Sequence, residues 1–574
     1  MSTVLTSVFG IAGGLAMFLF GMTGMSEALQ KAAGEKMKAV LSFLTRNRVM
    51  GALAGALVTA VLQSSSATTV MTIGFVSAGL MTLPQAISVI FGANIGTTMT
   101  AQLIAFKISD YIYPIIFAGF LIQFLSKKEN VKNIGLVIFY FGLLFEGIEI
   151  MSSVMKPVAN SPVFTELMGK VKDIPILGIL LGLGMTLIVQ SSSATIAILQ
   201  SFAAQAGPDG AASVIGLTGA IPILLGDNIG TTITALLASI GQSRDAKRTA
   251  IAHSVFNITG TIVFAFFISQ FASFVRWISP KGPEISVISR QIANAHTTFN
   301  VVCTLVWVPL LPLMVKIVKR IIPDRTGVPA KKRESALDIR VISQPAAALT
   351  LVSTEIRREL AGITGLLSSM GDLLLGKEKN SAAFADALSE EKDRCRDVSE
   401  YISAMFSVGS LTKEQAEEAS GFLVLSNNAD RISDRCHDIV QHADDMASRG
   451  VSFSEEAGQE LKASLATVEK IYAGTVSLLE DGSPSLEAAG RISRAKSKLR
   501  KNIKNIEKAH LARVKEKKCD ASLTPVFVDI LYNMDRISDN CLSLSEEALA
   551  GTRLTVREVP KELQQGSLPA SPQE

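Results

Sequence analysis

Charged residues, cysteines and catalytic motifs are scarce in this 574-residue chain, and each shortage is informative. Residues 1–320 hold only 21 Lys+Arg and 12 Asp+Glu, a composition that excludes a wholly soluble protein. The five cysteines show no CxxC spacing, which argues against a disulfide framework or a zinc site and favours free thiols. The sequence shows no nucleophile–base constellation or nucleotide-binding loop, so we expect no enzyme. The net charge of +4 is too small and too evenly mixed to indicate a nucleic-acid partner.

Two long uncharged runs dominate the first part of the chain. Val49–Phe106 is 58 residues without a charge and Ile174–Pro208 is 35, whereas one spanning helix needs about 20 apolar residues. Both runs contain many Ser, Thr, Gln, Asn and Gly residues, whose polar groups must face protein or a water-filled cavity at membrane depth. We therefore expect a multi-pass transporter or channel in the lipid bilayer of the plasma (inner) membrane.

The same part of the chain is duplicated. Three motifs recur in the same order, with an offset that grows slowly from 121 to 134 residues. They are GLAMFLFG at 14–21 and GLVIFYFG at 135–142, QSSSAT at 63–68 and 190–195, and GANIGTT at 92–98 and GDNIGTT at 226–232. Chance does not produce three ordered matches of this kind, so the region contains two copies of one unit.

Each copy predicts an opening helix, a Gly-rich segment broken at QSSS, a helix carrying NIGTT and a last helix. The break at QSSS predicts a re-entrant hairpin of two half-helices, about 49–80 in the first copy and 174–206 in the second. Each copy then crosses the membrane three times, and an odd number of crossings inverts the second copy relative to the first. We therefore expect an all-α fold with inverted-topology repeats over residues 1–134 and 135–275, followed by one closing transmembrane helix at 276–320.

The two QSSS motifs predict a binding site for an oxygen-rich anion. A half-helix that begins near the membrane midplane exposes free backbone N–H groups and the positive end of its dipole, and Ser and Gln side chains add donors. Neither hairpin contains Lys or Arg, so a co-bound cation such as sodium must offset the charge of the anion. The alternative is small-residue helix packing, with serine as interhelical glue. The candidate substrate- and ion-binding residues are Gln63, Ser64, Ser65, Ser66, Thr68, Asn94, Thr97, Thr98, Gln190, Ser191, Ser192, Ser193, Thr195, Asp227, Asn228, Thr231 and Thr232.

Asp227 is the one position at which the two NIGTT copies differ in kind, because the first copy has Ala93. A carboxylate inside an apolar segment is a candidate ion ligand, although a water-filled mouth would also accommodate it.

Two HxxFN motifs, at 253–257 and 296–300, place His and Asn four residues apart on one helix face. This spacing favours a buried polar network that fixes helix packing.

Paired QSSS hairpins, each followed by a GxNIGTT segment, resemble the sodium/phosphate cotransporter family, also called type II Na/Pi cotransporters. The resemblance covers about residues 1–320, and it implies that inorganic phosphate is held between the two QSSS motifs with sodium ions close by. Only about 22 residues separate the first helix of the second copy from its hairpin. The large extracellular loop of the animal members is therefore missing, and we expect a prokaryotic member.

Residues 344–550 have long charged helical patterns with few Gly or Pro breaks, and we expect six helices there. A second duplication aligns 428–436 with 533–541 at an offset of 105. This part resembles a PhoU domain, a pair of three-helix bundles linked to phosphate regulation. The resemblance implies carboxylate pairs that hold a divalent or iron-type metal, whereas the alternative is a solvated face balanced by neighbouring arginines. The candidate metal ligands are Asp430, Asp434, Asp535 and Asp539.

The leading hypothesis is a sodium-coupled inorganic phosphate symporter with a cytosolic PhoU-like domain that acts through a cytosolic regulatory partner. The alternatives are a phosphate exporter, a transporter of another oxyanion, or a membrane-anchored phosphate sensor. A basic linker at 321–343 joins the two parts, and the composition of 551–574 predicts a disordered tail.

The loop charges predict the orientation in the membrane. If the basic stretch after residue 315 lies inside, the inner loops carry eleven basic residues and the outer loops seven, and the N-terminus lies outside. We predict that a cysteine introduced as Thr3→Cys is labelled by a membrane-impermeant maleimide on intact cells, whereas Lys331→Cys is labelled only in inverted vesicles. The reverse pattern would contradict this orientation.

Overall fold

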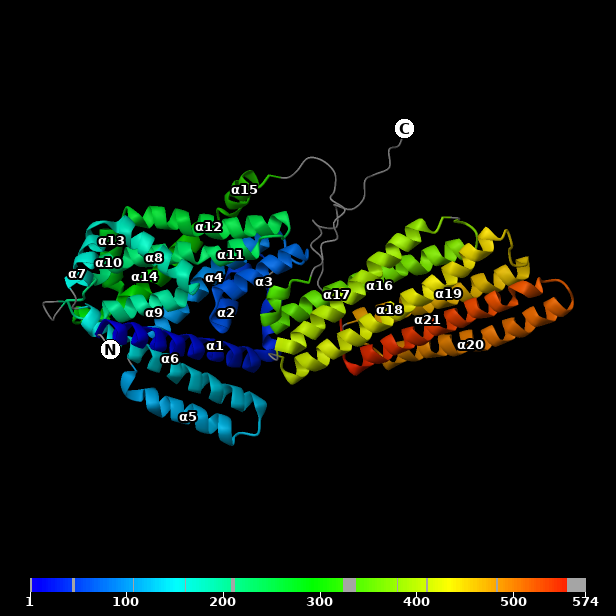
Figure 1. The fold of residues 1–574 in the computed structure, drawn as a ribbon, viewed down its shortest axis with the longest axis horizontal. Coiled ribbons are helices and arrows are strands. Elements are labelled where there is room, and N and C mark those ends of the chain that lie inside the picture. Colours follow the sequence, from blue (N-terminus) through cyan, green and yellow to red (C-terminus); the bar gives the residue numbers. More distant parts are fainter. Residues whose placement is uncertain are drawn as a thin grey trace. The chain divides into compact units, whose positions relative to one another are not determined.

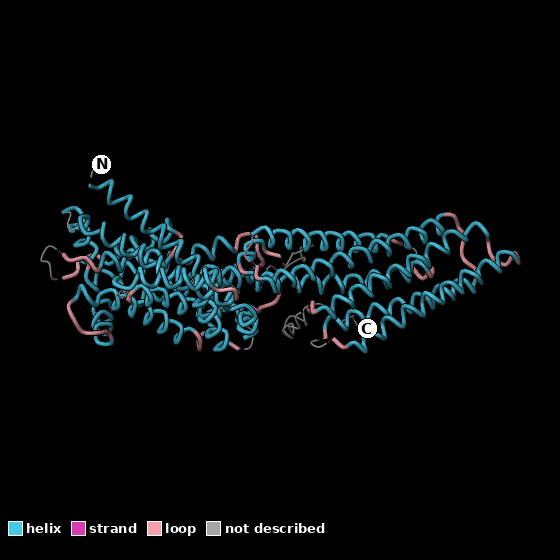
Figure 2. Tube along the Cα trace, turned by 90° about the horizontal axis from the view of Figure 1, so that it is seen from below, coloured by secondary structure: helices cyan, strands magenta, loops and turns pink. Residues whose placement is uncertain are grey.

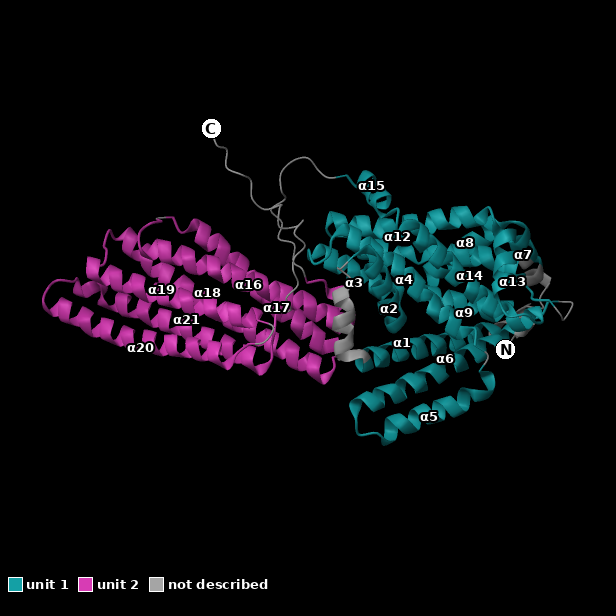
Figure 3. Ribbon diagram, turned by 180° about the vertical axis from the view of Figure 1, so that it is seen from behind, with its two compact units in different colours: residues 1–334, 562–574 teal, residues 335–561 magenta. Residues whose placement is uncertain are grey.

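The computed structural model describes residues 3–43, 47–106, 108–159, 162–207, 212–323, 337–378, 380–408, 411–481 and 484–554. The chain divides into two compact units, residues 1–334 with 562–574 and residues 335–561 (Figure 3). The described elements are all helical, apart from an isolated bridge between Ala206 and Ser213 (Figure 2). The all-α prediction is therefore confirmed. Most of the linker expected at 321–343 and of the tail expected at 551–574 lies outside the described residues.

The first unit contains the membrane helices (Figure 1). Its described elements are α1 (Thr3–Phe43), α2 (Arg48–Leu62), α3 (Ser65–Ser77), α4 (Leu83–Ile104), η1 (Ser109–Tyr111), α5 (Ile112–Leu125), α6 (Glu129–Ala159), α7 (Pro162–Asp173), α8 (Pro175–Val189), α9 (Ser192–Ala203), α10 (Gly216–Gly230), α11 (Thr232–Ala238), α12 (Arg244–Ala265), α13 (Ile268–Ile278), α14 (Glu284–Trp307) and α15 (Leu311–Ile321).

Four stretches of the described chain are long and apolar enough to cross a membrane: parts of α1 and α6, the whole of α4, and α10 together with α11. The bent pairs α12–α13 and α14–α15 raise the number to six if each pair is one span. The chain is therefore a multi-pass membrane protein. The seventh expected crossing falls on α5, whose 14 residues extend about 21 Å, less than the roughly 30 Å hydrocarbon core.

The closing transmembrane helix predicted at 276–320 corresponds to a bent pair of helices in the structure. α14 ends at Trp307, the axis bends by 87°, and α15 follows as a separate helix. Pro309 and Pro312 explain the break, because proline lacks the backbone N–H of the helical ladder and its ring clashes with the preceding turn. The last helix of the second copy is broken as well, since α12 and α13 meet at 93°.

The helices that open the two copies, α1 and α6, pack against each other and run antiparallel. A Cβ atom added to Gly14 would lie 2.7 Å from the carbonyl oxygen of Gly147, and one added to Gly21 would lie 2.6 Å from the backbone nitrogen of Leu144. Later positions on α1 thus meet earlier positions on α6, with backbones too close for larger side chains. Antiparallel opening helices are what inverted-topology repeats require.

Glycines also let each QSSS segment pack closely against the NIGTT helix of its own copy, in the same way in both copies. A Cβ at Gly92 of α4 would lie 1.8 Å from the Ala52 carbonyl oxygen of α2. The equivalent Gly226 of α10 would place its Cβ 1.9 Å from the Ile179 carbonyl oxygen of α8. Glycine is required at these points because the helices touch backbone to backbone, and this close packing fixes the position of each QSSS motif.

The second unit contains the six helices expected from the sequence (Figure 3). They are α16 (Pro345–Leu374), α17 (Ala382–Val408), α18 (Lys413–Ser448), α19 (Glu455–Glu480), α20 (Leu486–Lys515) and α21 (Thr524–Ala550), with the short η2 (Ile339–Ser343) and η3 (Ala521–Leu523). α16, α17 and α18 pack on one another, as do α19, α20 and α21. The two sets meet through α18 with α21 and through α16 with α19.

Three carboxylates are buried in the first of these helix sets. Glu355 and Glu391 lie close to Arg394, with contacts of 2.9 and 3.4 Å, whereas Glu359 accepts a hydrogen bond of 3.1 Å from Ser426. Burial and the neighbouring carboxylate of Glu391 raise the pKa of Glu359 well above its usual value. The folded unit therefore favours the neutral form of Glu359.

We predict that Glu359→Gln stabilises α16 above neutral pH. Because the folded-state pKa of Glu359 is raised, its contribution to stability is complete below the unfolded-state pKa and is lost as the pH rises. The neutral amide avoids that loss, so its advantage should be large at pH 8 and vanish near pH 4. Hydrogen exchange of α16 in the detergent-solubilised full-length protein measures this, with exposed Glu400→Gln as the control. An advantage independent of pH would contradict the explanation.

Candidate functional site

Both QSSS motifs break a helix in the same way. α2 ends at Leu62, Gln63 adopts the left-handed conformation with φ 49°, and α3 begins at Ser65. In the second copy, Gln190 has φ 55° between α8 and α9. Positive φ is uncommon and strained for a residue with a side chain, so two equivalent glutamines in this conformation mark a structural feature that both copies share.

The chain doubles back at each break. Thr59 of α2 donates a hydrogen bond of 2.8 Å to Thr68 of α3, and Thr186 and Thr195 make the equivalent contact of 3.1 Å. Nine residues of a straight helix would separate such side chains by about 13.5 Å along the axis. Each QSSS motif therefore lies at the tip of a helical hairpin, as the sequence predicts, and we call these tip 1 (residues 63–66) and tip 2 (residues 190–193).

The tips present hydrogen-bond donors. Ser64 and Ser191 cap α3 and α9 by accepting hydrogen bonds from the backbone N–H groups of Ala67 and Ala194. The hydroxyls of Ser65 and Ser192 make no hydrogen bond within the described part of the chain. Together with the free N–H groups of the first helical turn, these hydroxyls are available to an anion at each tip.

The NIGTT motifs use their side chains differently. The hydroxyls of four candidate residues donate to carbonyls of their own helix turn: Thr97, Thr98, Thr231 and Thr232. Asn94 lies 3.0 Å from the Nε2 of His253, and Asn228 lies 3.3 Å from the Nε2 of His296. All four of these side chains are buried, so the HxxFN motifs form the expected polar network.

Asp227 is buried beneath tip 2. Its side chain is 0% exposed, and its Oδ1 accepts a hydrogen bond of 2.6 Å from Thr186, the threonine that also bridges the hairpin to Thr195. Its Oδ2 is buried and has no hydrogen-bond partner among the described residues. A buried carboxylate oxygen without a donor is a suitable ligand for a cation or a proton. The first copy has Ala93 here, so this feature exists only once.

Sequence reasoning missed four threonines that hold the tips. Thr59 and Thr186 bridge the hairpin arms, and Thr100 and Thr234 contact tip residues. Each pair was detectable as a match at the repeat offset, since 59 and 186 differ by 127 and 100 and 234 differ by 134. All four lie outside the contiguous motifs that reveal the duplication.

The two copies of this arrangement match one family model, described as Na+/Pi-cotransporter, over residues 17–153 and 147–282. The "Uncharacterized protein YqeW" of Bacillus subtilis is 33% identical over 309 residues, which cover 54% of this chain and 96% of that protein. This chain belongs to the Na+/Pi-cotransporter family. No solved structure matches it.

Two further relatives carry functional names. The "Putative inorganic phosphate export protein YjbB" of Salmonella typhimurium is 22% identical over 542 residues, which cover 93% of this chain and 96% of that protein. The "Sodium-dependent phosphate transport protein 2A" of rat is 37% identical over 111 residues, which cover 18% of this chain and 17% of that protein. Membership of a transporter family implies a non-enzymatic role, and phosphate is the substrate of that family.

The acidic pairs of this transporter's second unit face basic side chains. Lys392 contacts Asp430 at 2.8 Å and Asp434 at 2.5 Å. In the second helix set, Arg500 contacts Asp535 at 2.8 Å and Asp539 at 3.0 Å. Within the described residues, no group of three or more His, Cys, Asp or Glu side chains could hold a metal ion. Both acidic pairs are thus balanced by basic side chains, as in the alternative to a metal site. Their main partners come from neighbouring helices rather than from the adjacent arginines.

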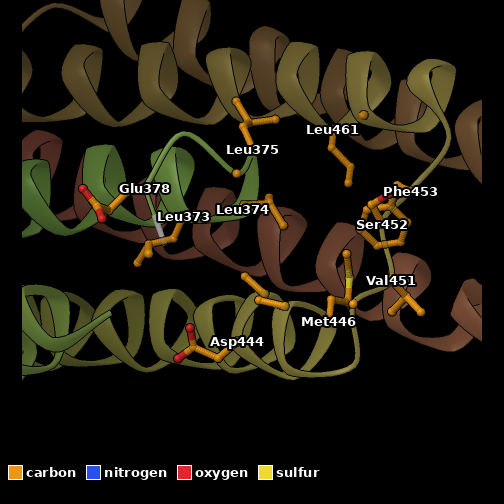
Figure 4. Close-up of a pocket in the computed structure, with 15 residues that line it drawn as sticks. Leu373, Leu374, Leu375, Glu378, Asp444, Met446, Val451, Ser452, Phe453 and Leu461 are labelled. Atoms are coloured by element: carbon orange, nitrogen blue, oxygen red, sulfur yellow. The ribbon is translucent and has the colours of Figure 1, made fainter. Parts of the chain in front are cut away.

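One cavity of about 550 Å³ lies at an end of the second unit (Figure 4). Leucines from the end of α16 line it opposite Met446 of α18, Leu461 of α19 and Phe453 of the connecting loop. Its charged side chains are Glu378 and Asp444, both acidic. An apolar cavity whose charged side chains are carboxylates repels phosphate, so this cavity is not a suitable anion site.

We predict that Asp227→Asn abolishes stabilisation of the transporter by sodium. If a cation binds the unpartnered oxygen, replacing it by an amide removes a charge-assisted contact of about 1.5–3 kcal/mol, roughly a 10- to 150-fold loss of affinity. The measurement is the melting temperature in sodium chloride compared with choline chloride. Glu149→Gln, an exposed carboxylate on α6, is the control. Equal sodium effects in the wild type and Asp227→Asn would remove Asp227 from the ion site.

Proposed function

We propose that this chain transports inorganic phosphate across the membrane, that the anion binds between tip 1 and tip 2, and that the net direction is export from the cytoplasm. The observation that carries the proposal is the pair of equivalent helix N-termini at the tips. Each offers free N–H groups and a serine hydroxyl, of Ser65 or Ser192, to an oxygen-rich anion. The antiparallel α1 and α6 support inverted repeats that place the two tips on opposite sides of one site.

The charge balance supports a co-transported cation. Each helix N-terminus contributes about half a positive charge, so the two tips together supply about one. Phosphate near neutral pH carries more than one negative charge, and Asp227 can add another. No Lys or Arg lies in either hairpin. Sodium is our proposed coupling ion, with Asp227, Thr186 and Thr195 as candidate ligands in the second copy.

The proposed direction of transport is supported by the names of the relatives that match most of the chain. Proteins named for phosphate export match 93–95% of this chain, whereas the rat proteins named for sodium-dependent transport match 15–18%. Sodium-coupled uptake, the leading hypothesis from the sequence, is therefore the second candidate. Sodium-coupled uptake is favoured by the names of the rat proteins, which match this chain over a short aligned segment.

We further propose that the second unit is a PhoU-like regulatory domain that responds to a cytosolic partner. Its two three-helix sets and their duplicated acidic motif support this assignment. A metal at either acidic pair would have to displace Lys392 or Arg500. The half-length YqeW shows that the family contains members about as long as the membrane unit of this chain.

We predict that expressing this protein speeds the loss of radiolabelled phosphate from preloaded cells, and that Ser65→Ala and Ser192→Ala each slow that loss. Removing one donor from a water-poor site costs about 1–3 kcal/mol, roughly a 5- to 150-fold drop in flux. Ser273→Ala, whose hydroxyl bonds its own helix on α13, is the control. If external sodium instead drives accumulation of the label, the protein works in uptake. If both tip variants show normal flux, the serines only pack helices.

A further inference from the structure

The two hairpin tips are equivalent in sequence but not in their contacts. The repeat offsets pair Gln63 with Gln190, and they pair Thr100 with Thr234 in the extended motifs NIGTTMT and NIGTTIT. In the first copy, the hydroxyl of Thr100 donates a hydrogen bond of 2.9 Å to the Oε1 of Gln63, and both side chains are buried. In the second copy, no hydrogen bond joins Thr234 and Gln190 within the described residues.

The hydroxyl of Thr234 makes its hydrogen bonds with residues other than Gln190. Its hydroxyl lies 3.0 Å from the carbonyl oxygen of Thr231 on its own turn and 3.1 Å from the hydroxyl of Ser66 on tip 1. Gln190 is exposed, and its side chain makes no hydrogen bond within the described part of the chain. Tip 1 therefore makes hydrogen bonds with both Thr100 and Thr234, whereas tip 2 makes a hydrogen bond with neither of these two threonines within the described residues.

One contact outside the motifs also favours this arrangement. Ser26 of α1 donates a hydrogen bond of 2.5 Å to the carbonyl oxygen of Leu62, the last residue before tip 1. The offset of 121 that relates the opening helices pairs Ser26 with Gly147, which has no hydroxyl. The second copy cannot make this contact, so the state with tip 1 held has one additional hydrogen bond.

Two equivalent motifs in opposite bonding states indicate a pair of conformations of similar free energy. In the second conformation, each threonine would make the hydrogen bonds that its counterpart makes in the first. Thr234 would then bond Gln190, and Thr100 would turn toward Ser193, the counterpart of Ser66. The hydrogen bonds lost equal those gained, apart from the Ser26 contact. A carrier needs two states whose populations a ligand can shift, and such an exchange provides them.

We propose that Thr100 and Thr234 are positioning residues that hold the two tips in alternation, Thr100 closing on Gln63 in the conformation described here and Thr234 closing on Gln190 in the opposite one. This inference rests on the proposed transport function, because it supplies the conformational step by which a site between the tips opens to either side. Neither threonine needs to contact phosphate itself.

The test compares amide hydrogen exchange at the two tips in the detergent-solubilised full-length protein. Thr100→Val keeps the shape of the side chain and removes its hydroxyl. We expect it to speed exchange in peptides covering residues 60–68 and to slow it in peptides covering 187–195. The change should be about fivefold, as expected for one ordinary hydrogen bond. Thr234→Val should shift both tips in the opposite direction, and Thr100→Ser should restore the wild-type pattern.

A purely structural role gives a different result. If Thr100 only packs tip 1, Thr100→Val loosens residues 60–68 and leaves 187–195 unchanged, and this outcome would overturn the inference. Phosphate counterflow, measured after the same proteins are reconstituted into liposomes, separates the two proposals. Reciprocal exchange in a protein that moves no phosphate would refute the proposed function alone, whereas phosphate counterflow without reciprocal exchange would refute the threonine exchange alone.

Discussion

A helix that breaks inside a membrane must have its free backbone groups covered by protein or by a water-filled cavity, and the rest of this membrane unit depends on that constraint. The glycine contacts of α2 with α4 and of α8 with α10 meet it. They bring an unbroken helix backbone against each hairpin, so the ends of the broken helices can be left free for a ligand. Larger residues at Gly92 or Gly226 would push the hairpins away and expose the breaks to lipid.

The function proposed for this family member depends as much on the differences between the copies as on their likeness. The shared features are the left-handed glutamines, the serine caps and the threonine bridges, and they give two tips that present hydrogen-bond donors. Asp227 has no counterpart in the first copy and Ser26 has none in the second. In the proposed mechanism, the first difference supplies a negative charge for a cation, and the second biases which tip is held. A perfectly symmetric pair would offer neither coupling nor a preferred resting state.

In the second unit, the acidic pairs are balanced by basic side chains rather than by helix ends. Asp430 with Asp434 and Asp535 with Asp539 each face a basic side chain from the preceding helix of their set. These pairs are partly exposed, so each contributes little to stability. The buried Glu355 and Glu391 both contact Arg394, and burial raises the pKa of the neighbouring Glu359 well above its usual value.

The sequence by itself determined the duplication, the helical hairpins at QSSS, the six helices of the second unit and the polar network of the HxxFN motifs. These features depend on local backbone preference or on motifs that recur, and both are visible in one dimension. It did not determine the bends after α12 and α14, although Pro309 and Pro312 mark the second of them. Only the tertiary structure decided which partner each equivalent side chain uses. Thr234 bonds Ser66, 168 residues away, rather than its own glutamine, because the choice between two chemically equal partners depends on how the helices pack in three dimensions.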